Sequence, residues 1–172
     1  INRYEQNIKE IGYVDCLDMI QIMNEDAEAI NGNSENVCAS VKLQFKQEMV
    51  FTRQAFRGTL VIENSTSEKL TDISPFINAT NEDGILATGH EMQINLESVE
   101  GLVETTDGVY SLDGNQMGTF TFLFIPTKFA APNNDVTYKF GGSLTFNDGN
   151  GLKQHTLYPV ALLVKSSPDL DL

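Results

Sequence analysis

The sequence contains no tryptophan, only two histidines and only two cysteines. Sugar-binding modules favour tryptophan because its large π surface stacks on sugar rings, so its absence disfavours a platform of that kind. A hydrolytic triad needs a base beside its nucleophile, and neither His90 nor His155 lies near a GxSxG elbow, a motif that the sequence lacks. His90-Glu91 lacks the second histidine of a zinc-binding helix. We therefore expect no catalytic residues and no resident cofactor, with both histidines at the surface.

Basic residues are also scarce, because 11 lysines and arginines oppose 24 acidic residues, which gives a formal net charge of −13. This charge repels phosphate backbones and anionic lipid, which disfavours nucleic-acid binding. No apolar run approaches the ~18 residues that span a bilayer. The longest runs, residues 120–126 and 158–164, have the length of strands. The sequence thus predicts no nucleic-acid partner and no membrane insertion.

The first part of the chain, residues 1–36, differs in periodicity from the rest. Apolar residues recur there every three or four positions up to Ile30, which is typical of amphipathic helices. We predict helices over residues 1–11 and 15–30 and assign this segment to the end of a preceding region. At the other end, residues 167–172 combine a proline with alternating aspartate and leucine, which predicts an extended linker-like tail.

From residue 37 onward the period changes to two, as in strands that bury one face. Val41, Leu43 and Phe45, for example, alternate with lysine and glutamine. The same pattern predicts strands near residues 41–45, 56–63, 73–77, 92–96, 119–124, 138–146, 152–158 and 160–164, the last two separated by Pro159. Few intervals have a helical pattern, so the fold class predicted for residues 37–166 is an antiparallel, Ig-like β-sandwich preceded by a short helical segment.

Some residues within these strands predict local features. Pro75 cannot donate a hydrogen bond to a ladder, so the strand over residues 73–77 is the expected edge strand. Gly141-Gly142 inside a strand pattern indicates a bulge or close packing. Residues 100–116 have the least readable pattern, which fits either a long loop or a further hairpin.

The two cysteines and the two sequons bear on the compartment of the protein, and the sequons agree with secretion. Cys16 and Cys38 have no CxxC spacing, so a single disulfide is their natural pairing in such a compartment, with two separate buried thiols as the alternative. Asn64-Ser65-Thr66 and Asn78-Ala79-Thr80 are N-glycosylation sequons, which makes Asn64 and Asn78 the predicted acceptors. We therefore expect a secreted or cell-surface protein.

Ligand sites of two kinds remain as alternatives. Calcium binds six to eight oxygen ligands, and residues 147–150, 81–83 and 169–171 are oxygen-rich, although hairpin turns have the same composition. Glycans would need exposed aromatic rings, for which Phe51, Phe56 and Phe129 are the candidates among phenylalanines that mostly belong to the core.

Several segments together resemble Ig-like or fibronectin type III-like modules of very large modular extracellular proteins, in which a short helical stretch can precede the sandwich. The segments are residues 37–48 (VCASVKLQFKQE), 52–56 (TRQAF), 58–64 (GTLVIEN), 124–127 (FIPT), 130–132 (AAP) and 138–144 (YKFGGSL). The resemblance implies that Tyr138 is the corner tyrosine of such sandwiches, whose hydroxyl bonds back to the backbone. It carries over no catalytic residue.

Three functions fit this sequence. The first is a non-catalytic structural or adhesive module that contacts other protein modules, or copies of itself, through edge strands. The second is a module that binds glycans or calcium. The third is an accessory domain of a secreted enzyme whose catalytic residues lie elsewhere in the parent chain.

Overall fold

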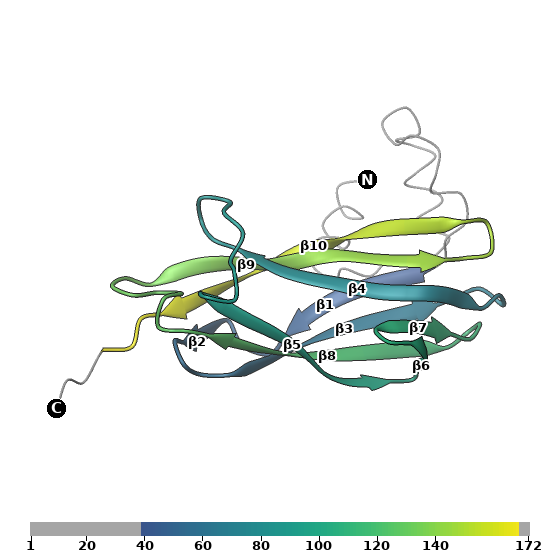
Figure 1. The fold of residues 1–172 in the computed structure, drawn as a ribbon, viewed down its shortest axis with the longest axis horizontal. Coiled ribbons are helices and arrows are strands. Elements are labelled where there is room, and N and C mark those ends of the chain that lie inside the picture. Colours follow the sequence, from purple (N-terminus) through teal and green to yellow (C-terminus); the bar gives the residue numbers. More distant parts are fainter. Residues whose placement is uncertain (1–38, 169–172) are drawn as a thin grey trace, which may run out of the picture.

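The computed structural model describes residues 39–168, which form strands, turns and loops (Figure 1). The strands are β1 (Ala39–Phe45), β2 (Met49–Phe51), β3 (Phe56–Asn64), β4 (Leu70–Thr80), β5 (Met92–Glu100), β6 (Val103–Thr106), β7 (Val109–Leu112), β8 (Met117–Pro126), β9 (Val136–Asn147) and β10 (Leu152–Lys165). The helices predicted over residues 1–11 and 15–30 lie outside the described residues, as do Cys16 and Cys38. Within residues 39–168, no helix has the length and hydrophobicity that crossing a bilayer requires.

The strands form two sheets that face each other across a shared core. One sheet has the order β1-β3-β8-β5 and the other has the order β2-β10-β9-β4-β7-β6. Every pair is antiparallel except β2 with β10, which is parallel. The predicted mainly β, sandwich-type fold is therefore confirmed, while the short strand β2 was not predicted.

Four phenylalanines, contributed by both sheets, form the centre of the core. Phe124 of β8 stacks on Phe56 of β3 with ring centroids 5.2 Å apart, and Phe45 of β1 meets Phe124 edge-on at 5.2 Å. From the other sheet, Phe140 of β9 makes a T-shaped contact with Phe124, also at 5.2 Å. Edge-to-face and offset geometries of this kind are the favourable ones for aromatic rings, so this cluster joins the two sheets.

Strand β10 is continuous, which makes the predicted break at Pro159 wrong. Pro159 lies in a bulge between Leu157 and Val160, where a proline needs no partner for the N–H that it lacks. Across the ladder Gly142 pairs with Leu157, and Gly141 packs beneath Pro159. The close packing predicted at Gly141-Gly142 is thus confirmed.

The poorly readable residues 100–116 contain the hairpin of β6 and β7. Its turn is at Asp107-Gly108, where Gly108 has a positive φ of 73°. Tyr110 of β7 makes a T-shaped contact with Phe120 of β8 at 5.0 Å. The hairpin therefore extends the six-stranded sheet and closes one side of the sandwich.

Tyr138 is the corner tyrosine that the resemblance implied. Its side chain is buried, and its hydroxyl donates a 2.8 Å hydrogen bond to the carbonyl oxygen of Ala130, eight residues upstream. This bond fixes the connection between β8 and β9 against the body of the sandwich.

Candidate interaction surface

The predicted edge lies on β4, but it begins one residue later than residues 73–77, because Ile73 still pairs with β7. On one side β4 pairs with β9, and on the other side it pairs with β7 only at Leu70 and Ile73. From residue 74 to residue 78, no strand among residues 39–168 pairs with this second side. An interior strand of the six-stranded sheet therefore becomes an edge strand along half of its length.

The exposed sheet edges carry features that oppose main-chain pairing with another strand. Pro75 removes a donor from the free side of β4. The edge strand β5 has a bulge between Leu96 and Ser98, where it carries the charged residue Glu97. Bulges, prolines and charges are the devices by which sheet edges avoid strand addition. Contact through side chains is therefore the more favourable mode for this edge.

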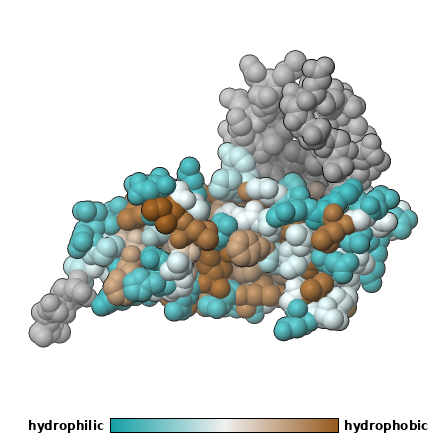
Figure 2. Space-filling model, turned by 45° about the horizontal axis from the view of Figure 1, so that its top comes forward, coloured by the Kyte–Doolittle hydropathy of each residue, from teal (hydrophilic) through white to brown (hydrophobic). Residues whose placement is uncertain are grey.

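Large apolar side chains remain exposed on and beside this edge. Phe76 on β4 is 60% exposed, Ile85 and Leu86 on the following loop are 62% and 52% exposed, and Leu96 on β5 is 40% exposed. We call these four residues the β4 surface. Figure 2 shows apolar surface gathered into a band across the middle of one face of the molecule, with hydrophilic residues at both ends. Exposed apolar groups that gather in this way mark contact sites more often than single exposed residues do.

The loop that bears Ile85 and Leu86 is held in place by its own hydrogen bonds. Asn81 Oδ1 accepts hydrogen bonds from the backbone N–H groups of Asp83 and Ile85, at 3.0 and 2.9 Å. Leu86 forms an isolated bridge with Thr80, the last residue of β4. The apolar side chains are therefore presented in a defined geometry, which reduces the entropy lost when a partner binds.

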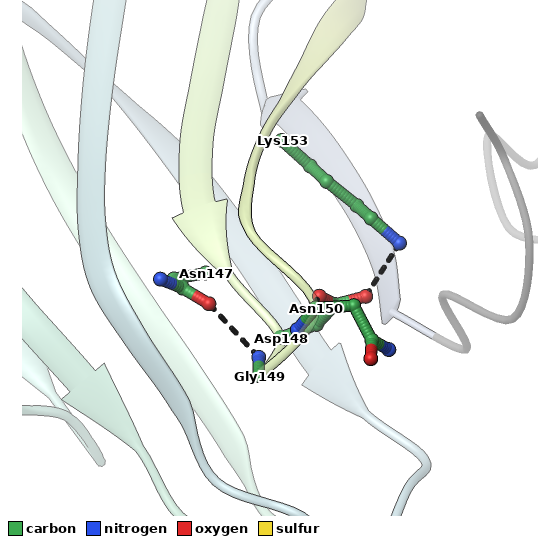
Figure 3. Close-up of polar contacts among 5 residues, drawn as sticks. All are labelled: Asn147, Asp148, Gly149, Asn150 and Lys153. Carbon is green, nitrogen blue, oxygen red and sulfur yellow. Dashed lines mark hydrogen bonds and ion pairs between the residues drawn. The ribbon is translucent and has the colours of Figure 1, made fainter.

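The oxygen-rich turn between β9 and β10 is occupied by internal contacts (Figure 3). Asn147 Oδ1 accepts a hydrogen bond from Gly149 N at 2.9 Å, and Asp148 Oδ1 accepts one from Asn150 N at 3.0 Å. Asp148 Oδ2 lies 2.6 Å from the Lys153 ammonium, and both side chains are largely buried. Burial acts to raise the pKa of Asp148, but the bond from Lys153 holds that pKa below its ordinary value. These oxygens therefore stabilise a hairpin turn and already have hydrogen-bond donors.

The other predicted calcium candidates do not form an acidic cluster in the described part of the chain. Among residues 39–168, no three histidine, cysteine, aspartate or glutamate side chains are grouped as metal ligands would be. In the loop after β4, Glu82 accepts a hydrogen bond from the backbone N–H of Thr137. Residues 169–171 lie outside the described residues.

The two sequon asparagines have different surroundings. Asn64 is only 1% exposed, and its amide nitrogen donates to the carbonyl oxygens of Glu68 and Asp113 at 2.8 and 3.2 Å. Its Oδ1 accepts hydrogen bonds from both the N–H and the hydroxyl of Thr66. A glycan would occupy the same buried nitrogen, so the folded domain disfavours glycosylation at Asn64. Asn78 is half-buried on β4 and stays a predicted acceptor.

Replacing Asn64 with alanine is expected to destabilise the domain by about 2–3 kcal/mol, because buried carbonyl groups lose their donors. The same replacement at Asn78 is the matched control and is expected to cost less than about 1 kcal/mol, since that position is only half-buried. Urea unfolding followed by circular dichroism measures both changes. Equal losses at the two positions would show that the Asn64 hydrogen bonds do not stabilise the fold.

The two histidines lie on different elements, with His90 exposed at one end of the sandwich. Its ring stacks on Phe129 with centroids 4.0 Å apart, and the Lys128 ammonium lies 5.2 Å from the centroid of the Phe129 ring. One face of this exposed phenylalanine is thus covered by an imidazole and is not available to a sugar. Of the other two phenylalanines considered for glycan contact, Phe51 is 47% exposed and Phe56 is buried in the core.

His155 was predicted to lie at the surface, but it is half-buried on β10, where it pairs with Leu144 of β9. Burial lowers the pKa of its imidazole from the ordinary value of 6.5. The unfolded chain therefore binds a proton more readily than the folded chain at this residue. The contribution of His155 to stability is complete above pH 6.5 and falls as the pH decreases below that value.

Replacing His155 with glutamine is expected to weaken the acid dependence of stability. The free energy of unfolding of the unmodified protein should decrease more steeply between about pH 7 and pH 5 than that of the variant. Urea unfolding at a series of pH values measures this. The difference in the free energy of unfolding between the two proteins near pH 8 is the baseline. Parallel curves for the two proteins would contradict the burial of an ionisable imidazole.

No protein-family model matches the chain, and no curated protein matches it in sequence. Among solved structures, AvmM, described as catalysing macrocyclization in alchivemycin A biosynthesis, aligns at a TM-score of 0.53 and 7% identity, over 80% of this chain and 94% of AvmM. A family 123 glycoside hydrolase from Clostridium perfringens aligns at 0.50 and 10% identity, over 75% of this chain.

This chain spans only 27% of the length of that glycoside hydrolase. MyfA, the major subunit of the Myf fimbriae of Yersinia enterocolitica, aligns at a TM-score of 0.41 and 14% identity, over 74% of this chain and 99% of MyfA. At these identities the comparisons describe the fold alone. The two facing sheets of residues 39–168 form a β-sandwich.

Proposed function

We propose that this domain is a non-catalytic Ig-like module of a secreted or cell-surface protein, and that it joins or spaces other protein modules. The observation that supports this most directly is the β4 surface. It places Phe76, Ile85, Leu86 and Leu96 in solvent on or beside a strand edge that no other strand of residues 39–168 covers. A stable fold that leaves such side chains exposed is suited to contact with another protein.

The placement of the titratable groups agrees with a non-catalytic role. His90 is stacked on Phe129, whereas His155 lies half-buried on β10 and opposite Leu144. The largely buried ion pair of Lys153 with Asp148 closes a hairpin turn. Each of these groups has a structural explanation within the sandwich.

The test is site-specific crosslinking in the cells that produce the protein. A photoreactive phenylalanine analogue replaces Phe76, and the control places the same analogue at Leu152, which is 70% exposed at the start of β10. We expect a protein partner to be crosslinked from position 76 and not from position 152.

Binding of the purified partner should then weaken at least about 10-fold in the Phe76→Ser variant, as for a central contact residue. The same partner crosslinked equally from both positions, or unchanged affinity in the Phe76→Ser variant, would reject the β4 surface as the contact site.

A further inference from the structure

Charge is distributed very unevenly between the two parts of the described sandwich. Residues 70–127 contain nine acidic residues and no lysine or arginine. The remaining described residues, 39–69 and 128–168, contain nine basic and five acidic residues. The formal charges are therefore −9 for the first part and 9 − 5 = +4 for the second.

The strand order shows that this asymmetry of charge along the sequence is also an asymmetry in space. Residues 70–127 form β4, β5, β6, β7 and β8. Strands β4, β7 and β6 make one end of the six-stranded sheet, and β5 is one edge of the four-stranded sheet. In Figure 1 these strands lie together on the near side of the sandwich, with β1 and β10 behind them. The side of the domain that carries the β4 surface is therefore its acidic side.

Individual acidic side chains lie next to the apolar ones in the chain. Asp83 is exposed on the loop that presents Ile85 and Leu86, and Asp72 is exposed on β4 four residues before Phe76. Glu97, next to Leu96, forms a bidentate ion pair in which Arg57 donates hydrogen bonds of 2.6 and 2.7 Å. The strand β4 and the loop that follows it thus carry exposed carboxylates as well as the exposed apolar residues.

We infer that the partner of the β4 surface is a protein segment in which apolar side chains are bordered by lysine or arginine. This rests on the proposed function and names the chemistry of its partner. A basic border meets the acidic side, steers the encounter and adds to specificity, whereas the apolar side chains supply the buried contact. A second copy of the chain fits less well, because two molecules of formal charge −13 repel each other.

The experiment uses the full chain and two fluorescent peptides of about twelve residues, the length of a long strand. One peptide alternates lysine with valine, and the control peptide alternates glutamate with valine. Fluorescence anisotropy gives the affinities, and amide chemical-shift changes in NMR spectra locate the binding site. We expect the lysine peptide to bind and to shift the amides of residues 74–78 and 85–86. Raising the salt from about 20 to 200 mM should weaken this binding at least about 10-fold, because screening reduces the attraction.

Two sets of variants test the two parts of the contact. Phe76→Ser should weaken the binding of the lysine peptide at least about 3-fold. The double variant Asp72→Asn with Asp83→Asn should do the same. The matched control is Glu48→Gln with Glu68→Gln, which neutralises two exposed carboxylates outside residues 70–127 and should leave the affinity unchanged.

The outcomes separate this inference from the proposed function. Equal binding of the glutamate peptide, equal effects of the two double variants, or shifts located elsewhere would overturn the basic partner. Self-association in sedimentation experiments that disappears in Phe76→Ser would also overturn it, because the surface would then belong to a second copy. The proposed function would survive these results, since it is tested separately by crosslinking from position 76 and by the affinity of the crosslinked partner for the Phe76→Ser variant.

Discussion

Replacing Gly142 with alanine is expected to destabilise the domain by at least about 4 kcal/mol, the range in which single substitutions become exceptional. Gly142 has a φ of 136°, which residues with a side chain rarely adopt. A Cβ atom at this position would lie 1.8 Å from the carbonyl oxygen of Phe76 on the neighbouring strand β4. Since that contact is with backbone, relief requires β4 to move away from β9. The substitution therefore combines backbone strain with a steric clash.

Its neighbour Gly141 provides a matched control. A Cβ atom there would meet Pro159 at 3.5 Å, an ordinary van der Waals distance, so Gly141→Ala should cost less than about 1 kcal/mol. Gly149→Ala separates the two causes, because Gly149 has a φ of 93° but open space around it. It should cost about 1 kcal/mol from strain alone. Chemical denaturation measures the free energy of unfolding of all three variants. Equal losses of stability in Gly141→Ala and Gly142→Ala would contradict the clash.

Gly142 also fixes the position of the candidate contact site. The carbonyl oxygen that lies next to Gly142 belongs to Phe76, whose side chain is exposed on β4. A displacement of β4 at this point would move the Phe76 side chain. Gly142→Ala should therefore also weaken binding at the β4 surface, even at a temperature where the variant remains folded.

The period of two from residue 37 onward was sufficient to predict the sandwich, because alternation reports directly which side chains face a core. The same signal could not reveal β2, which has only three residues and is defined by its parallel pairing with the end of β10. It also failed at Pro159. A proline interrupts the pattern locally, but whether it ends a strand depends on the bulge that the partner strand β9 permits.

The candidate site was partly visible in the sequence. Pro75 correctly indicated an edge, since a proline is tolerated where a ladder needs no donor. The exposure of Phe76, in contrast, depends on which face of β4 is covered, and alternation alone does not decide that. The lack of lysine and arginine over residues 70–127 was also present in the sequence, but the strand order is needed to show that these residues share one side.

Asn64 shows why a local motif is a poor guide to accessibility. A sequon in a polar segment predicts an exposed acceptor, and the sequence around Asn64 fits that description. Its burial depends on Asp113, 49 residues further along, whose carbonyl group accepts one of its hydrogen bonds. A neighbouring bond joins Asn115 N to the Thr66 carbonyl at 2.8 Å. The contact between these two turns is long-range, so local composition does not reveal it.

Replacing Phe124 with alanine is expected to cost about 3–5 kcal/mol, the usual range for removing a buried aromatic side chain. Phe124 is fully buried and contacts rings from β1, β3 and β9, so its loss leaves a cavity between the two sheets. The matched control is Phe76→Ala, which removes the same number of atoms from a ring that is 60% exposed. That change should cost less than about 1 kcal/mol. Thermal and urea unfolding measure both variants.

Comparing these two variants also tests whether Phe124 and Phe76 have different roles. If Phe124 holds the sheets together and Phe76 contacts a partner, Phe124→Ala should lower stability and Phe76→Ala should lower only partner affinity. A large stability loss in Phe76→Ala would instead make Phe76 part of the fold, and its exposure would then no longer argue for a contact site. Because the two effects are measured separately, a structural role and a binding role of the same residue type can be distinguished in one protein.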